Sequence, residues 1–162
     1  MPMPPFRRIF HPTDFSAADS AAFAHAVKLA CLVQGELTIM HVDPAIGRKD
    51  FEDFPRIRPL LSRWGVLPEG SSKEDVAKLG VRIKRVRAVA GNATGAILEQ
   101  LAAHPTELLV LSTHQREGFA RLTRHAIAEP LARGTHARTL FVPAGVEGFV
   151  SAETGSTNLR RV

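Results

Sequence analysis

The sequence contains few of the residues that mark secreted or membrane-bound proteins. Its single cysteine, Cys31, cannot form a disulfide within the chain, which fits a reducing compartment. No apolar run approaches the roughly 18 residues that cross a bilayer, and residues 1–8 lack the apolar stretch of a secretory signal. Aromatic residues make up only 6% of the chain, so the core must consist mainly of Ala, Val, Leu and Ile. We therefore expect one soluble, cytoplasmic domain without a membrane partner.

Motifs for catalysis and metal binding are also missing. The chain has no Gly-x-Ser-x-Gly elbow, P-loop or complete dinucleotide-binding fingerprint. Its seven histidines include no His-x-x-x-His pair, although His11, His41 and His114 each fall near the end of an expected strand. A metal site would need three or four ligands that are themselves held by further contacts. We predict no catalytic residue, no metal ion and, at most, a weak ATPase activity.

The chain is basic, with a net charge of +5 and a pI near 10.1, which raises the question of a polyanionic partner. However, acidic residues stand between most of the basic ones. The densest cluster is Arg82, Lys84, Arg85 and Arg87, which partly alternates with apolar residues and predicts the solvated side of a strand. No aromatic RNA-binding motif, helix-turn-helix or zinc finger accompanies it. We therefore do not expect a nucleic-acid partner.

Strand and helix patterns alternate along the chain. Apolar runs predict strands at residues 6–12, 37–42, 81–89, 108–111 and 138–142. Helical spacing and capping signals predict helices at 17–34, 57–64, 73–79, 93–103 and 119–133. The first helix should begin at a capping box of Ser16 and Asp19. Pro130 should kink the last helix or end it early.

This order predicts an α/β fold with a five-stranded parallel, doubly wound sheet and helices on both faces. Residues 1–144 should form the domain, and residues 145–162, which include few apolar side chains, should form a flexible tail or linker. Ligands of such sheets bind beyond the carboxyl ends of the strands. The loop after the strand at 108–111 is therefore the first candidate for a site.

The segment around that loop resembles the last third of a universal stress protein domain. The similarity rests on Leu109 to His114, Gly118, Arg121-Leu122 and Ala128-Glu129. Weaker matches extend it from about Phe6 to Ala144, and they comprise Phe10 to Ser16, His41 to Asp43, Gly91-Asn92 and Leu140 to Pro143. The resemblance implies a Rossmann-like sheet of the adenine nucleotide alpha hydrolase type and a role in the stress response.

In ATP-binding proteins of this family, the segment reads Gly-x-x-Gly, nine residues, then Gly and Ser or Thr. On this sequence, these positions fall on Ser112, Gln115, His125 and Ala126, so every phosphate-handling residue is replaced. Bulky side chains hinder the close approach of a phosphate to backbone amides, which glycine allows. Each ~1.4 kcal/mol that is lost weakens binding about tenfold. We therefore predict a degenerate nucleotide loop.

The adenosine half of the family site is better preserved. The four loop positions named above are not the only nucleotide-binding positions of the family. By family position, the others fall on Pro12, Thr13, Asp14, Val42, Gly91, Asn92 and Leu111. The resemblance implies that Asp14 and the backbone of Val42 hold adenine and ribose, but Asp14 has a second interpretation as a brace for its own turn. Three arginines near the loop offer positive charge that compensates for the lost glycines: Arg116, Arg121 and Arg124. No cofactor is required on this interpretation, and ATP or AMP is the alternative ligand.

The last strand and the C-terminal residues suggest partners. In the family the last strand commonly pairs across a dimer, and the uncharged stretch Thr139, Leu140, Phe141 and Val142 suits an edge strand of that kind. We therefore expect a homodimer. Residues 159–162 echo residues 6–9 at the start of the first strand, which is consistent either with the first half of a tandem protein or with a basic tail and a chance match.

Overall fold

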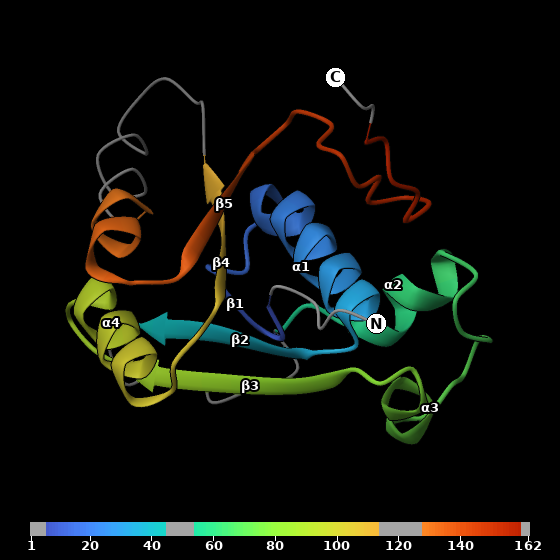
Figure 1. The fold of residues 1–162 in the computed structure, drawn as a ribbon, viewed down its shortest axis with the longest axis horizontal. Coiled ribbons are helices and arrows are strands. Elements are labelled where there is room, and N and C mark those ends of the chain that lie inside the picture. Colours follow the sequence, from blue (N-terminus) through green and yellow to red (C-terminus); the bar gives the residue numbers. More distant parts are fainter. Residues whose placement is uncertain (1–5, 45–53, 114–127, 160–162) are drawn as a thin grey trace.

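The computed structural model describes residues 6–44, 54–113 and 128–159. Its five strands form one parallel sheet in the order β3-β2-β1-β4-β5, which confirms the predicted fold class (Figure 1). The strands are β1 (Arg8–Pro12), β2 (Glu36–Asp43), β3 (Arg82–Val89), β4 (Leu108–Thr113) and β5 (Arg138–Pro143). The helices are α1 (Ser20–Val33), α2 (Ile57–Arg63), α3 (Lys73–Lys78) and α4 (Ala93–Ala103), with a 3₁₀ helix at Ala17–Asp19.

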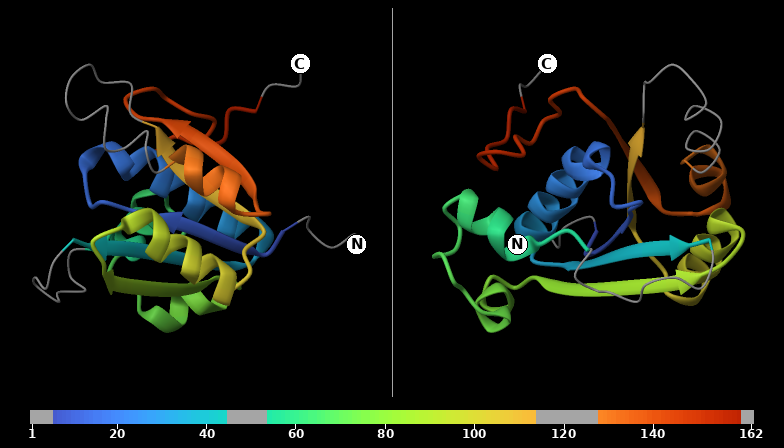
Figure 2. Two further views of the ribbon diagram at one scale, coloured as in Figure 1. Left: turned by 90° about the vertical axis from the view of Figure 1, so that its left-hand side faces the viewer. Right: turned by 180° about the vertical axis from the view of Figure 1, so that it is seen from behind.

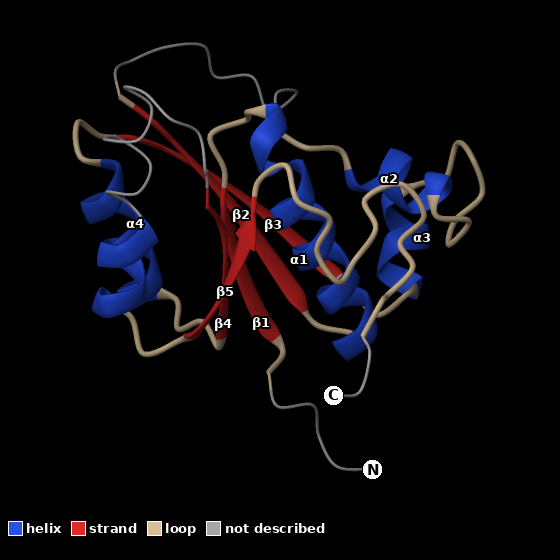
Figure 3. Cartoon of the chain, turned by 90° about the horizontal axis from the view of Figure 1, so that it is seen from above, coloured by secondary structure: helices blue, strands red, loops and turns tan. Residues whose placement is uncertain are grey.

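Helices cover both faces of the sheet (Figure 3). Helices α1, α2 and α3 lie on one face, and α4 lies beside the helical residues 128–134 on the other (Figures 1 and 2). Because side chains alternate along a strand, neighbouring residues of one strand enter different cores. In β1, for example, Ile9 packs in the core beneath α1, whereas Phe10 packs in the core beneath α4.

Two local predictions are wrong. Ser16 makes no side-chain cap, because the Asp19 carboxylate instead accepts hydrogen bonds from Thr13 and from the Asp14 amide. Arg87 is not on a solvated side, since its side chain is only 10% exposed and pairs with Asp43. The predicted helix at 119–133 falls mostly outside the described residues. Residues 128–134 are helical, so the helix does not end at Pro130.

Residues 145–159 lie against α1 and α2. The Val150 amide donates to His25 Nε2 at 3.2 Å, and Trp64 Nε1 donates to the Ala152 carbonyl at 3.0 Å. Val150 is only 2% exposed. At Gly148, an added Cβ would lie 2.3 Å from His25 Nε2, so only glycine fits this close approach. The predicted boundary at residue 144 stays a prediction.

Among the residues that the structure describes, no helix has the length and apolar character needed to span a membrane.

Candidate functional site

The candidate site lies where the carboxyl ends of β1, β2 and β4 meet. The chain passes from β1 outward through β2 to β3 and then returns to the other side of β1 as β4. The strand order therefore reverses between β1 and β4, and open α/β sheets bind ligands in the crevice at such a point. We call this region the carboxyl-end crevice.

Hydrogen bonds within its own residues hold the loop after β1. The Asp19 carboxylate accepts from Thr13 Oγ1 at 3.1 Å and from the Asp14 amide at 2.8 Å. Asp14 Oδ1 in turn accepts from the Ser16 amide at 2.9 Å. Burial, together with the neighbouring Asp14 charge, raises the pKa of Asp19 to about 6. Asp14 thus does brace its own turn, as the local interpretation predicted, while its exposed carboxylate stands at the mouth of the crevice.

The backbone of Val42 faces the crevice. The Met40 carbonyl accepts from the Thr13 amide at 2.8 Å, whereas the Asp43 carbonyl accepts from the Ala90 amide at 2.9 Å on the other side of β2. Since backbone polar groups alternate between the two sides of a strand, those of Val42 point as those of Met40 do, toward β1. β1 has already ended at Pro12, opposite Met40. The Val42 amide and carbonyl therefore point into the space beyond the end of β1.

A group of side chains that the sequence analysis did not bring together lines the β2 side of the crevice. Phe15 stacks on His41 with ring centroids 3.8 Å apart. His41 Nε2 lies 3.1 Å from Asp43 Oδ1, and Arg87 Nε donates to Asp43 Oδ2 at 2.6 Å. This hydrogen bond from Arg87 is the main reason that the pKa of Asp43 is lowered. Phe15 takes a left-handed backbone conformation, φ +63°, so this loop is held in a conformation that a bulky residue rarely adopts.

At the β4 side, a side-chain hydrogen bond bridges the crevice. Ser112 Oγ donates to the Ala18 carbonyl at 3.2 Å, which ties the end of β4 to the loop after β1. Leu111 is 3% exposed and packs beneath α4, so only its backbone can face a ligand. His11 is fully buried, its Nδ1 lies 3.0 Å from the Val110 carbonyl, and burial lowers its pKa to about 4. His11 is therefore neutral near pH 7.

The start of α4 adds the last described part of the predicted site. Asn92 Oδ1 accepts from the Gly95 amide at 3.1 Å and so caps the helix. The space beside Gly91 is open, since an added Cβ there would meet no atom within 4 Å. The remaining predicted residues lie outside the described part of the chain, and their roles stay predictions: Gln115, Arg116, Arg121, Arg124, His125 and Ala126.

β5 forms one edge of the sheet. Val142 is buried, Thr139 and Leu140 are partly buried, and Phe141 is 46% exposed. Within the described residues, no strand pairs with the outer side of β5. Those residues also contain no group of three or more His, Cys, Asp or Glu side chains that is arranged to hold a metal ion.

These features define a doubly wound α/β protein with a candidate site at the carboxyl ends of its strands. The chain belongs to the universal stress protein family, whose model matches residues 5–143. No curated protein matched the sequence.

Solved structures of universal stress proteins share the fold at low sequence identity. The chain is similar to the universal stress protein UspA from Lactobacillus plantarum, with 20% identity, a TM-score of 0.57, and 86% of this chain and 99% of that chain covered. It is also similar to a universal stress protein solved in complex with cAMP, with 18% identity and a TM-score of 0.55. This match covers 86% of this chain and 98% of that chain. A protein from Archaeoglobus fulgidus DSM 4304 gives 18% identity and a TM-score of 0.59, and the match covers 89% of this chain but 46% of that one.

Proposed function

We propose that this chain is a non-catalytic stress-response module that acts through self-association and partner contact, and that its nucleotide loop is degenerate. The observation that carries this proposal is the contrast between the two edges of the sheet. The β3 edge carries the exposed charges of Arg82, Lys84 and Arg85, and charges on an edge strand discourage pairing with another chain. From Thr139 to Val142 the β5 edge carries no charge, and it exposes the Phe141 ring.

A second copy of the chain is the partner that suits this edge. Two β5 strands related by a twofold axis would run antiparallel and present the same residues to each other. Such pairing would satisfy the outer backbone groups of β5 and cover Phe141. The tandem arrangement suggested by residues 159–162 would offer the same strand to a second domain rather than to a second copy.

The degenerate loop is supported by the position of Ser112. The family motif has a glycine here, whereas the Ser112 side chain in this protein is bonded to the Ala18 carbonyl across the crevice. A phosphate that approached the end of β4 would have to displace this contact. The bond is consistent with a crevice that is closed by the protein's own groups.

Sedimentation of the wild-type protein and of two matched variants tests the self-association. We expect a dimer for the wild type and a monomer for Phe141→Glu, because a buried charge in the pairing edge would lose its hydration without a partner. Val89→Glu is the control, since Val89 is exposed to a similar degree on the opposite edge strand. A monomeric wild type, or equal dissociation in both variants, would contradict the proposed dimer through β5.

The second candidate function is an adenosine-ligand sensor. It is favoured by the Val42 backbone, which faces the crevice, and by the exposed Asp14 carboxylate nearby. A universal stress protein of the same fold has been solved with cAMP, so an adenine nucleotide is the ligand class to try. Binding that Asp14→Ala abolishes, with the fold retained, would favour the sensor over the degenerate loop.

A further inference from the structure

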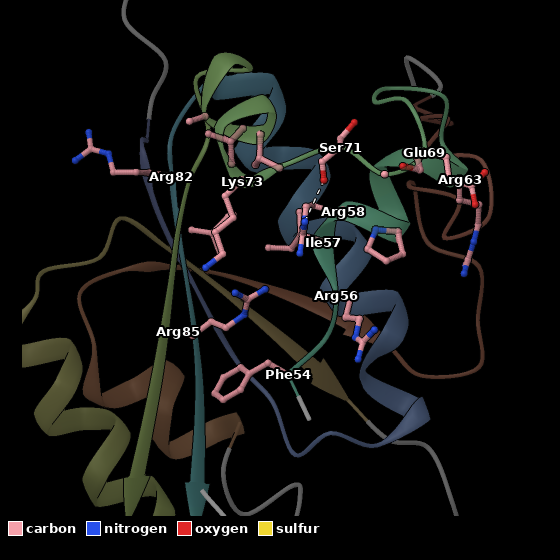
Figure 4. Close-up of a pocket in the computed structure, with 17 residues that line it drawn as sticks. Phe54, Arg56, Ile57, Arg58, Arg63, Glu69, Ser71, Lys73, Arg82 and Arg85 are labelled. Carbon is pink, nitrogen blue, oxygen red and sulfur yellow. Dashed lines mark hydrogen bonds between the residues drawn. The ribbon is translucent and has the colours of Figure 1, made fainter. Parts of the chain in front are cut away.

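A basic cavity lies at the β3 edge, and Phe54 of its lining contacts Phe15 of the carboxyl-end crevice. It has a volume of about 1170 Å³ and is bordered by α2, α3 and β3 (Figure 4). Among the described residues of its lining, Glu69 is the only acidic one. The six cationic residues in its lining are Arg56, Arg58, Arg63, Lys73, Arg82 and Arg85.

Three of these cations converge from three elements. Figure 4 shows the side chains of Lys73 and Arg85 directed toward the same space between α3 and β3, with Arg58 on the opposite side. Arg58 is held in place, because its Nη1 donates to the Ser71 carbonyl at 3.1 Å. Partial burial and the nearby Arg58 charge both lower the pKa of Arg85. The cavity thus gathers like charges that repel one another.

These charges lack counterions among the described residues, where neither Lys73 nor Arg85 forms an ion pair. Neighbouring cations on β3 differ in this respect. Lys84, which points to the other face of the sheet, pairs with Glu36 at 2.9 Å, and Arg87 pairs with Asp43. Arg82 also pairs with Glu36, so Arg85, on the cavity side, is the one β3 cation without an ion pair among the described residues.

The rest of the lining limits the kind of anion. Ile57, Val76 and Val81 are buried and form an apolar wall. Phe54, the only aromatic residue among the described residues of the lining, is 2% exposed, so its ring is not available to stack on the bases of a single-stranded nucleic acid. The cavity volume lies close to the range of about 300–1,000 Å³ for small-molecule sites. A small ligand fits these observations better than a polymer does.

We propose that this cavity binds a small anion that carries two or more phosphate groups. Arginine guanidinium groups match phosphate oxygens with paired hydrogen bonds, and lysine adds a point charge. Three converging cations call for more than one negative charge, which a single carboxylate does not supply. The described lining of this cavity shares no residue with the carboxyl-end crevice, and the proposal does not depend on the function proposed there.

Calorimetric titration with inorganic tripolyphosphate tests the site. We expect binding to the wild-type protein, a loss of affinity of about tenfold or more in the double variant Arg58→Gln/Arg85→Gln, and a change below about twofold in Lys84→Gln. Lys84→Gln is a matched control because it removes the same charge from the adjacent position of β3. Asp14→Ala should leave the affinity unchanged, which separates this site from the crevice.

Thermal unfolding provides a readout that also detects a misfolded variant. Removal of mutually repelling charges should leave the double variant at least as stable as the wild type, and tripolyphosphate should raise the Tm of the wild type and of Lys84→Gln more than that of the double variant. Absence of binding to the wild type, or equal weakening by Lys84→Gln, would overturn the proposal. Tighter binding of a single-stranded oligonucleotide or of a hexaglutamate peptide through the same two arginines would overturn the assignment to a small phosphate ligand.

Discussion

At the scale of the residue, polar contacts on the β2 side of the crevice converge on Asp43. Its carboxylate receives Arg87 and lies beside His41, on which Phe15 stacks. The sequence indicated a strand at residues 81–89 but not this ion pair. Its formation depends on the register that sets Asp43 beside Val89, and register across parallel strands is not visible in the pattern of one strand. Arg87 therefore looked like a solvated residue.

Asp43→Asn should lower the free energy of unfolding by about 2 kcal/mol, because the largely buried Arg87 would lose the carboxylate charge to which it donates hydrogen bonds. Glu36→Gln, which removes a β2 carboxylate paired with the exposed Lys84, should cost less than about 0.5 kcal/mol. Urea unfolding near neutral pH measures both. Because the folded pKa of Asp43 is lowered from 3.8, its contribution is present above that pH and is lost as the pH falls below it. Equal costs for the two variants would contradict this account.

At the scale of the element, local signals predicted helices well where one residue caps them. Asn92 caps α4 through the Gly95 amide, and the predicted range 93–103 matches the observed helix. Ser72 and Asp75 form a full capping box at α3. The same pattern at Ser16 and Asp19 gave a wrong prediction of a capping box. Thr13 and the Asp14 amide bind the Asp19 carboxylate instead, and the capping-box pattern does not include these two groups.

The two serines of these patterns should therefore respond differently to alanine. Ser72→Ala removes the acceptor of the Asp75 amide and should lower the free energy of unfolding by about 1 kcal/mol. Within the described part of the chain, Ser16 Oγ is buried without a hydrogen-bond partner, so Ser16→Ala should be neutral or slightly stabilising. Chemical denaturation of the two variants side by side measures the difference. A larger loss for Ser16→Ala than for Ser72→Ala would show that the Ser16 pattern is a working cap.

At the scale of the whole molecule, the order of elements was enough to predict a parallel, doubly wound sheet. It did not predict how distant segments meet. The basic cavity combines residues from α2, α3 and β3, and the docking of residues 145–159 depends on His25 in α1. These contacts join positions far apart in sequence, so no local spacing signals them.

Docking of the C-terminal segment should depend on pH. His25 Nδ1 lies 2.6 Å from the Ala21 carbonyl, so this nitrogen carries the proton and Nε2 accepts from the Val150 amide. Burial lowers the pKa of His25 from 6.5. The contact is therefore fully present above pH 6.5 and weakens as the pH falls toward the lowered folded value.

Hydrogen exchange at the Val150 amide, corrected for intrinsic rates, measures this effect. Protection should fall between pH 7 and pH 5 in the wild type and should be almost independent of pH in His25→Gln. Trp64→Phe, which removes the hydrogen bond to Ala152 but no titratable group, should keep the wild-type pH dependence. An identical pH profile in the wild type and His25→Gln would contradict the role of His25.

A calorimetric titration of nucleotide-stripped protein with ATP and then AMP tests whether the nucleotide loop is degenerate. Three glycines of the family motif are replaced by Ser112, Gln115 and His125, and each replacement that costs ~1.4 kcal/mol weakens binding about tenfold. We expect no detectable binding of either nucleotide up to about millimolar concentration. Micromolar binding that disappears in Asp14→Ala would contradict it and would establish the crevice as a working adenosine site.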